Sequence, residues 1–211
     1  MARIGNAKKA YDYIYQQIIS EKKELGAPIS EMEISEALGM SRSPIREAFK
    51  LLEMQGIIVH YPNRGTFVTD MTRKDIAEIF QLRIMIEMEA LDNAYIYMDE
   101  SVLSTLKQNI EKLDENSEVD EYYTANTALH KTIVNYSGNS RMIKFYDTLS
   151  MQIALVNHLS AKLPSHFQES KQKHLAIVEA LIKKDKEEAA KLLREHLEEV
   201  RDKTMLLCAM D

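Results

Sequence analysis

Three histidines in the second half of the chain occupy positions from which imidazole could bind a metal ion. His130, His174 and His196 each share a predicted helical face with apolar residues, so all three side chains are expected to point inward from separate helices. Asn126 lies four residues before His130, one turn back on the same face. Neutral imidazoles that converge from the helices of a bundle are a usual way to hold a divalent transition metal.

The same positions also fit three ordinary core histidines, each with its own hydrogen-bond partner. For any single histidine this is the more common situation. Burying three polar rings without a shared purpose is costly, however, which favours a common site. Because the residues lie far apart in the chain, their spacing alone decides nothing, and both interpretations stay open.

A second candidate is the stretch SRSPIREAFKLLEMQG, residues 41–56, which predicts an amphipathic helix with a positive side. Its apolar stripe follows helical spacing through Ile45, Ala48, Phe49 and Leu52. Ser43, Arg46 and Lys50 cluster within about 60° of one another on the opposite side. Arg42 begins the helix, where unpaired N–H groups favour a phosphate. A solvated basic face is the alternative.

The neighbouring elements favour DNA binding for this helix. An amphipathic helix is expected over 7–20, and a second helix over 30–39 opens with a capping-box pattern and closes at a glycine. After a tight turn and the 41–56 helix, residues 57–68 read as two strands around a turn that carries Arg64 and Gly65. This order predicts a winged helix-turn-helix, whose second helix enters the major groove, where arginine can read guanine.

The composition changes after residue 70. Most glycines and prolines lie in the first 65 residues, whereas only Gly138 and Pro164 occur beyond residue 70. We therefore predict a DNA-binding domain at 1–71 and an all-helical effector-binding and dimerisation domain at 72–211, which makes the protein mainly α. The second domain should be a six-helix antiparallel bundle with helices near 72–98, 101–116, 119–137, 139–160, 164–184 and 186–207. The first of these is apolar nearly all round, so a second subunit is expected to cover part of it.

Charge and composition restrict the class of protein further. The net charge is −6, but residues 1–72 balance at zero, so the acidic character belongs to the second domain. No apolar run is long enough for a transmembrane helix, and the N-terminus lacks the apolar core of a secretory signal. A single cysteine, Cys208, cannot form an internal disulfide. These features predict a cytoplasmic protein without a membrane partner.

Residues 27–68, APISEMEISEALGMSRSPIREAFKLLEMQGIIVHYPNRGTFV, resemble the DNA-binding domain of the GntR family of bacterial transcription regulators. The resemblance implies that Arg42, Ser43 and Arg46 contact DNA from the recognition helix and that Arg64 and Gly65 do so from the wing. The family often has an arginine early in the preceding helix. Here the corresponding run is EMEI, with a methionine at position 32, so that contact is lost or replaced.

The segments NTALHKTIVNYSGN (126–139), KHLAIVEALIKKD (173–185) and EHLEEV (195–200) resemble the metal-containing effector domain of the FadR subgroup of this family. Six helices suggest its shorter, VanR-like branch. The resemblance implies that His130, His174 and His196 bind a divalent metal such as Zn, Ni or Mn. Asn126 stands where the family has an aspartate. An amide is a weaker ligand without charge, which predicts a lower metal affinity or partial occupancy and favours an anionic effector.

Arg83 is a lone cation in the apolar stretch LRIMIEMEA. One interpretation is an ion pair with Glu87, four residues on. The resemblance suggests another, in which Arg83 lies at the edge of the effector pocket and binds the carboxylate of a small organic acid.

These features together predict a ligand-responsive regulator, acting as a repressor, that binds a pseudo-palindromic operator as a homodimer. Two rivals remain. One is a regulator whose histidines are only structural and whose effector is apolar. The other is a metalloenzyme, against which the sequence offers no H-E-x-x-H motif and no evident acid beside the histidines. We therefore do not expect an enzyme.

Overall fold

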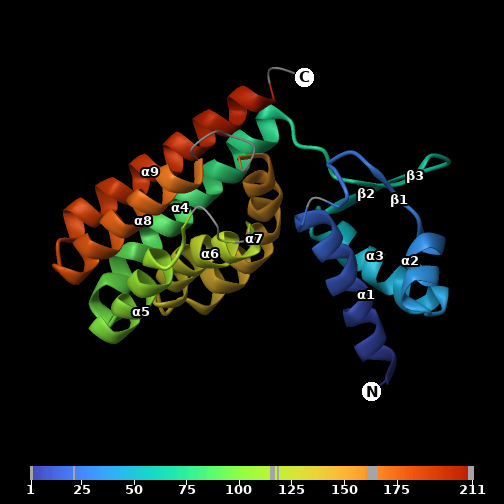
Figure 1. The fold of residues 1–211 in the computed structure, drawn as a ribbon, viewed down its shortest axis with the longest axis horizontal. Helices are drawn as coiled ribbons and strands as arrows, with labels where there is room; N and C mark the ends of the chain where they lie inside the picture. Colours follow the sequence, from blue (N-terminus) through green and yellow to red (C-terminus); the bar gives the residue numbers. More distant parts are fainter. Residues whose placement is uncertain (1, 21, 115–116, 118, 161–165, 209–211) are drawn as a thin grey trace. The chain divides into compact units, whose positions relative to one another are not determined.

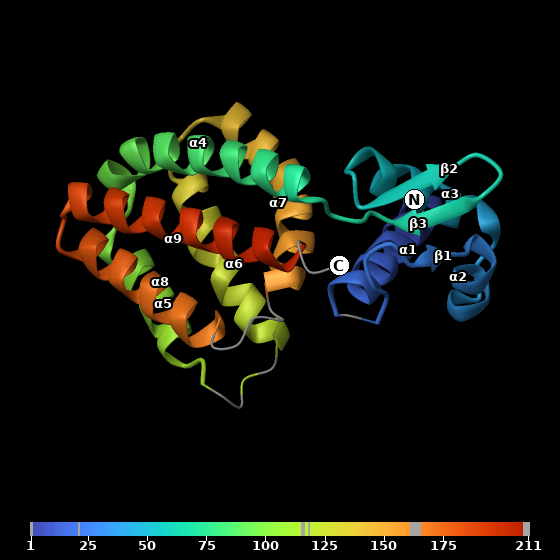
Figure 2. The same cartoon turned by 90° about the horizontal axis from the view of Figure 1, so that it is seen from above.

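The computed structural model describes residues 2–20, 22–114, 117, 119–160 and 166–208. Within these residues it contains nine helices and a three-stranded sheet, so the chain is mainly α as predicted. The chain divides into two compact units. The first comprises Met1–Thr72 with Ser150–His158, and the second comprises Arg73–Leu149 with Leu159–Asp211. Figures 1 and 2 show the elements of each unit.

The first unit is a winged helix-turn-helix. Its elements are α1 (Ala2–Ile19), β1 (Pro28–Ile29), α2 (Glu31–Leu38), α3 (Arg42–Met54), β2 (Ile58–Tyr61) and β3 (Gly65–Val68). Helix α1 packs along α3, and α2 lies beside both (Figure 1). Ile14 and Ile18 of α1, together with Ile45 and Leu52 of α3, are almost completely buried, so apolar faces close the core of this unit.

The boundaries of α2 follow from its terminal residues. The Ser30 hydroxyl accepts hydrogen bonds from the backbone N–H groups of Met32 and Glu33, so two donors at the start of the helix are satisfied. Gly39 ends the helix with φ 60°, in the left-handed region that favours glycine. The chain then turns within three residues into α3. The predicted capped helix and tight turn are both confirmed.

The sheet has the order β1-β3-β2, with both pairs antiparallel. The register of the hairpin places Ile58 opposite Val68 and Tyr61 opposite Gly65, so the predicted pair of strands around a turn is confirmed. The sequence did not predict β1. This strand has only two residues, too few to show the alternation by which a strand is recognised.

The second unit is an all-helical bundle. Its helices are α4 (Arg73–Tyr97), α5 (Glu100–Glu111), α6 (Val119–Asn135), α7 (Ser140–Ser160), α8 (His166–Ile182) and α9 (Lys186–Leu207), of which α7 also contributes to the first unit. Predicted helix ends at 115–116 and 164–165 lie outside the described residues. None of the helices in the described ranges is both long and apolar enough to cross a membrane.

The packing of the bundle determines which helices can share a site. The longest helix, α4, packs against α9 on one side and α6 on another, while α8 packs against α9, α5 and α6 (Figures 1 and 2). Helices α4, α6, α8 and α9 therefore enclose a common interior. The three histidines singled out above come from α6, α8 and α9.

Candidate functional site

Helix α3 separates buried apolar residues from exposed polar ones, as its sequence predicts. Its buried residues are Pro44, Ile45, Ala48, Phe49 and Leu52. The candidate DNA-binding residues of the helix, Arg42, Ser43, Arg46 and Lys50, lie outside this buried set. The cationic side of α3 is therefore available at the surface of the first unit.

Arg46 is held by an acidic residue of the preceding helix. Its Nε donates to the Glu31 carboxylate at 2.9 Å, which joins the recognition helix α3 to the first residue of α2. An exposed ion pair of this kind contributes little to stability. It does restrict the orientation of the Arg46 side chain, while the outer N–H groups of the guanidinium lie beyond this contact.

The wing is a tight turn between β2 and β3. The backbone N–H of Arg64 donates to the carbonyl of Tyr61 at 3.0 Å, and the Arg64 guanidinium lies 5.6 Å from the centre of the Tyr61 ring. Asn63 and Gly65 both have positive φ, 63° and 102°. Arg64 and Gly65 are exposed, so the turn presents a cation next to a residue without a side chain.

In the second unit, the three histidines meet in the interior of the bundle. His130, His174 and His196 are 1%, 2% and 2% exposed. The Nε2 atom of His174 lies 3.3 Å from Nε2 of His130 and 3.0 Å from Nε2 of His196. One potential ligand atom from each residue lies within 4.8 Å of the others, a spacing that suits a single metal ion. The inward orientation expected from the sequence is therefore observed.

A buried carboxylate lies directly beside this cluster. Glu87 of α4 is fully buried, and its Oε2 lies 2.6 Å from Nδ1 of His130. Its other oxygen, Oε1, accepts hydrogen bonds from Arg83 Nε and from the Tyr146 hydroxyl, both at 2.7 Å. The ion pair between Arg83 and Glu87 that the sequence suggested is thus present, with Arg83 only 2% exposed.

Glu87 corrects one argument from the sequence, which expected no acid beside the histidines. The carboxylate comes from a helix 43 residues earlier in the chain, so spacing gave no signal for this contact. Glu87 is nevertheless poorly suited to act as a general base. Burial alone would raise the pKa of its carboxyl, but His130 and Arg83 outweigh this effect and lower the pKa to about 2.

The protonation of the histidines favours metal binding. Burial disfavours the imidazolium and lowers the pKa of His130, although Glu87 opposes the shift. Burial, together with repulsion from His174 and His130, lowers the pKa of His196 well below its usual range. Both rings are therefore neutral at pH 7. Nδ1 of His130 faces the Glu87 carboxylate, and Nε2 of the same ring faces His174.

The unsatisfied oxygen of Asn126 and the two close neighbours of His174 Nε2 support the fit to a metal. A neutral His174 has either one proton or one lone pair at Nε2, so it cannot make two good hydrogen bonds to its neighbours. Nearby, Oδ1 of the buried Asn126 and Nδ1 of His196 have no hydrogen-bond partner among the described residues, which is costly in a bundle interior. A cation can accept several lone pairs at once, so a set of three imidazoles and an amide oxygen suits a divalent metal.

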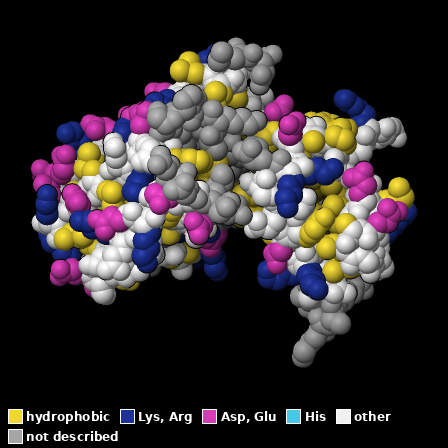
Figure 3. Space-filling view, in the orientation of Figure 1, with side chains coloured by type: hydrophobic (Ala, Val, Ile, Leu, Met, Phe, Trp, Pro, Cys, Tyr) yellow, Lys and Arg dark blue, Asp and Glu magenta, His cyan; other side chains and the backbone are white. Residues whose placement is uncertain are grey.

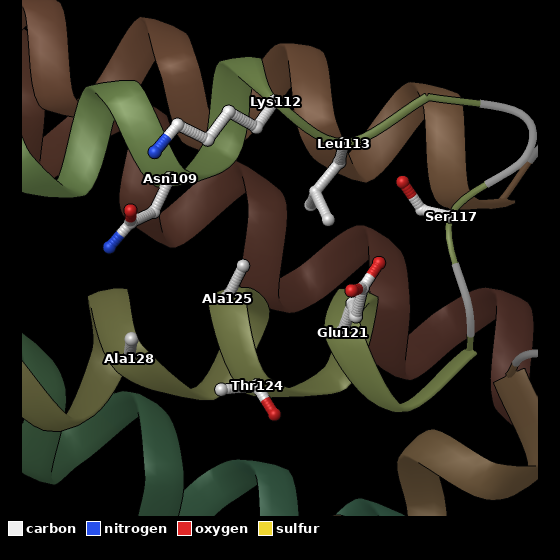
Figure 4. Close-up of a pocket in the computed structure, with 8 residues that line it drawn as sticks. All are labelled: Asn109, Lys112, Leu113, Ser117, Glu121, Thr124, Ala125 and Ala128. Carbon is white, nitrogen blue, oxygen red and sulfur yellow. The ribbon is translucent and has the colours of Figure 1, made fainter.

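An open pocket of about 410 Å³ lies apart from this cluster, between the end of α5 and α6 (Figure 4). Leu113 and Ala125 point toward each other across it. Its lining residues are Asn109, Lys112, Leu113, Ser117, Glu121, Thr124, Ala125 and Ala128, with none of the three histidines. The pocket is therefore separate from the histidine cluster, which remains the candidate site of the second unit.

Comparisons with known proteins find two family matches along the chain. Residues 6–68 match the bacterial regulatory proteins of the gntR family, and residues 78–199 match the FCD domain. The gluconate operon transcriptional repressor of Bacillus licheniformis is 28% identical over 96% of this chain and 86% of its own length.

Two solved structures are also similar. A putative GntR regulator from Rhodococcus sp. RHA1 has a TM-score of 0.82 at 23% identity, covering 95% of this chain and 98% of its own, and so supports the fold. The Zn²⁺-bound FCD domain of TM0439 has a TM-score of 0.57 at 29% identity, covering 65% of this chain and 96% of its own.

The chain belongs to the GntR family, in the FadR-type subgroup that carries an FCD domain. Members of this family are transcription regulators that bind DNA operators, and the protein is a regulator rather than an enzyme. The metalloenzyme interpretation is thereby set aside.

The neutral, buried histidines predict a pH-dependent stability for the metal-free protein. In the unfolded chain each histidine protonates near its ordinary pKa of 6.5, whereas the folded protein keeps His130 and His196 neutral to lower pH. The unfolded state then binds more protons, so the free energy of unfolding should fall as the pH drops from 7 to 5. The slope below pH 6.5 is up to about 1.4 kcal/mol per pH unit for each histidine.

Urea unfolding in the presence of a chelator at several pH values measures this slope. The variant His196→Gln should show a smaller slope than the wild type. His60→Gln, which changes an exposed histidine of the wing, serves as the matched control for the replacement of an imidazole by an amide. Equal slopes for His196→Gln and the wild type would contradict the assignment of His196 as neutral in the folded state.

Proposed function

We propose that this protein is a repressor that binds a pseudo-palindromic operator as a homodimer and responds to a small organic acid at a metal centre in its FCD domain. The observation that carries the metal-dependent part is the convergence of three buried imidazoles beside an unpartnered amide oxygen among the described residues. In this proposal residues 1–71 bind DNA, and residues 72–211 bind the effector and the second subunit. Such a regulator acts in the cytoplasm.

The proposed DNA contacts come from the exposed side of α3 and from the wing. Arg42, Ser43 and Arg46 would lie in the major groove, with Lys50 nearer the phosphates. Arg46 would reach DNA with its guanidinium already oriented by Glu31, which leaves its outer N–H groups to bind a guanine. Arg64 and Gly65 of the wing would approach the backbone or the minor groove. Because the first 72 residues have no net charge, affinity depends on the local arrangement of these cations.

His130, His174 and His196 would hold the metal, with Asn126 as a weaker fourth ligand. The Zn²⁺-bound state of the FCD domain of TM0439, at 29% identity, supports zinc, while Ni and Mn remain candidates on ligand chemistry. When bound, the metal supplies a Lewis-acid site for an oxygen ligand. The four protein ligands are neutral, so they leave the charge of the cation uncompensated, which favours an anionic effector.

A carboxylate effector agrees with the charges of the site and with the name of one relative. Arg83 is our candidate for its second contact, through guanidinium N–H groups other than the Nε that binds Glu87. One relative is named for the gluconate operon, and gluconate is a small organic acid. Its name as a repressor also supports repression by this protein. An effector of this kind would alter DNA binding by favouring one of two conformations of the dimer.

The proposed dimer contact uses the side of α4 that its own bundle leaves uncovered. Leu82 and Met85 of α4 are 39% and 61% exposed, whereas Phe80 and Leu91 of the same helix are buried in the bundle. A groove of about 570 Å³ runs beside them, lined by Ala77, Gln81, Ile84 and Met85 of α4 and by Glu198, Arg201, Asp202 and Met205 of α9. Figure 3 shows positive, negative and apolar side chains interspersed over one face of the second unit. The groove itself combines apolar residues with Arg201 and with the acidic Glu198 and Asp202, and both signs of charge beside apolar surface suit a self-complementary interface.

Substitutions on α3 test the DNA-binding part of the proposal. Arg42→Ala or Arg46→Ala should weaken operator binding by roughly 1–3 kcal/mol if the residue reads a base. Lys50→Ala should weaken it less and mainly reduce its salt dependence. Fluorescence anisotropy with operator DNA at several salt concentrations measures both effects, with Lys183→Ala, a lysine of the second unit, as control. Wild-type affinity in both arginine variants, with the protein folded and dimeric, would refute the assignment.

Calorimetric titration of the chelated protein with Zn, Ni and Mn tests the metal centre. We expect one metal per chain, and Asn126→Asp should tighten it by roughly tenfold because a carboxylate adds charge to the ligand set. The same change should weaken an anionic effector. His174→Ala should abolish metal binding and effector response but spare operator binding. His60→Gln should leave metal binding and effector response intact. Absence of binding by the wild type, or unchanged binding by His174→Ala, would rule out this centre and favour structural histidines with an apolar effector.

Sedimentation equilibrium of the full chain tests the dimer. The wild type should be a dimer at micromolar concentration, and Met85→Asp should raise the dissociation constant by roughly tenfold or more by placing a charge in an apolar contact. Met54 of the first unit is 81% exposed, so Met54→Asp is a matched control that should leave the dimer intact. A well-folded wild-type monomer would argue that the protein pairs only on DNA.

A further inference from the structure

Glu87 is a fully buried carboxylate that contacts one of the histidines without belonging to the set of proposed metal ligands. We propose that Glu87 is the positioning residue of the metal centre: it keeps the proton of His130 on Nδ1 and thereby presents Nε2 as an unprotonated ligand. This inference rests on the proposed metal centre. It concerns Glu87, which is not a proposed ligand, and Nδ1 of His130, whereas the proposed ligand atom is Nε2. The tautomer of His130 can be measured without metal.

The argument begins with the two tautomers of a neutral imidazole. The proton can reside on either ring nitrogen, and the hydrogen bond made by one nitrogen decides the state of the other. In His130, Nδ1 lies 2.6 Å from Oε2 of Glu87, and an ionised carboxylate only accepts hydrogen bonds. The Nδ1 atom must therefore donate. The Nε2 atom, which faces His174 at 3.3 Å, is left with its lone pair.

The carboxylate is itself fixed by two further donors of the second unit. Oε1 accepts from Arg83 Nε and from the hydroxyl of Tyr146 on α7, both at 2.7 Å, so Oε2 is the oxygen left to face His130. All of these groups are buried, which makes their hydrogen bonds strong and their loss costly. The two donors on Oε1 determine the orientation of the carboxylate, and the carboxylate determines the tautomer of His130.

The same contacts predict the effect of an isosteric amide. In Glu87→Gln, Arg83 and Tyr146 both donate, so the amide oxygen should take the Oε1 position and the NH₂ group should face Nδ1 of His130. An NH₂ group donates, so Nδ1 must accept and the ring proton must move to Nε2. That tautomer has no lone pair directed at the metal. Loss of an outer-shell partner of this kind typically weakens metal binding by roughly 10- to 100-fold.

Two measurements on the full chain test the inference. Long-range ¹H–¹⁵N NMR spectra of the metal-free wild type, with His130 assigned by the loss of its signals in His130→Gln, should show a proton on Nδ1 and none on Nε2. Glu87→Gln should reverse this pattern and raise the dissociation constant for Zn by roughly 10- to 100-fold in calorimetry. Glu89→Gln, a glutamate on the same helix outside its buried set, is the matched control and should change neither quantity.

The possible failures can be distinguished. A wild-type His130 with its proton on Nε2 would overturn the role of Glu87 even if Glu87→Gln failed to fold. A folded Glu87→Gln that keeps Nδ1–H and wild-type metal affinity would also overturn it, while the metal centre itself would stand. If the wild type binds no metal, the centre and the role of Glu87 in it both fall.

Discussion

The burial of the Glu87 carboxylate is the constraint on which the interior of the second unit depends. An ionised carboxylate without solvent is stable only if charged or hydrogen-bonding partners surround it. Glu87 has three: Arg83 on its own helix, Tyr146 on α7 and His130 on α6. Removing any of them would leave a buried group unsatisfied. The arrangement therefore ties three helices together around one point and fixes the orientation of His130.

The histidine cluster follows from this fixed point. Once Nδ1 of His130 faces the carboxylate, its Nε2 faces His174, and His174 in turn faces His196 at 3.0 Å. The cluster is polar and buried, yet Oδ1 of Asn126 and Nδ1 of His196 remain without partners among the described residues. The unsatisfied Asn126 oxygen beside the fully satisfied Glu87 is an observation that supports the proposed metal centre.

The first unit depends on a different kind of interaction. Its core is closed by apolar faces of α1 and α3, and the cations of α3 and the wing lie at the surface, where ion pairs contribute little to stability. The contact between Arg46 and Glu31 accordingly bears on the orientation of a candidate DNA-binding side chain more than on folding. The two units thus differ in where their charged side chains lie. The second unit buries charged side chains next to the histidine cluster, and the first exposes cations on a surface that could bind a polyanion.

The sequence by itself determined the features that depend on local periodicity and on the residues at the ends of helices and in turns. The division of α3 into buried and exposed sides, the cap at Ser30, the left-handed Gly39 and the hairpin all follow from residues close together in the chain. The inward direction of the three histidines was also predictable, because each shares its helical face with apolar residues. Only the tertiary structure decided which side chains meet. The partners of Glu87, the contact of His130 with His174 across 44 residues and the strand β1 depend on packing between distant segments, which no local pattern encodes.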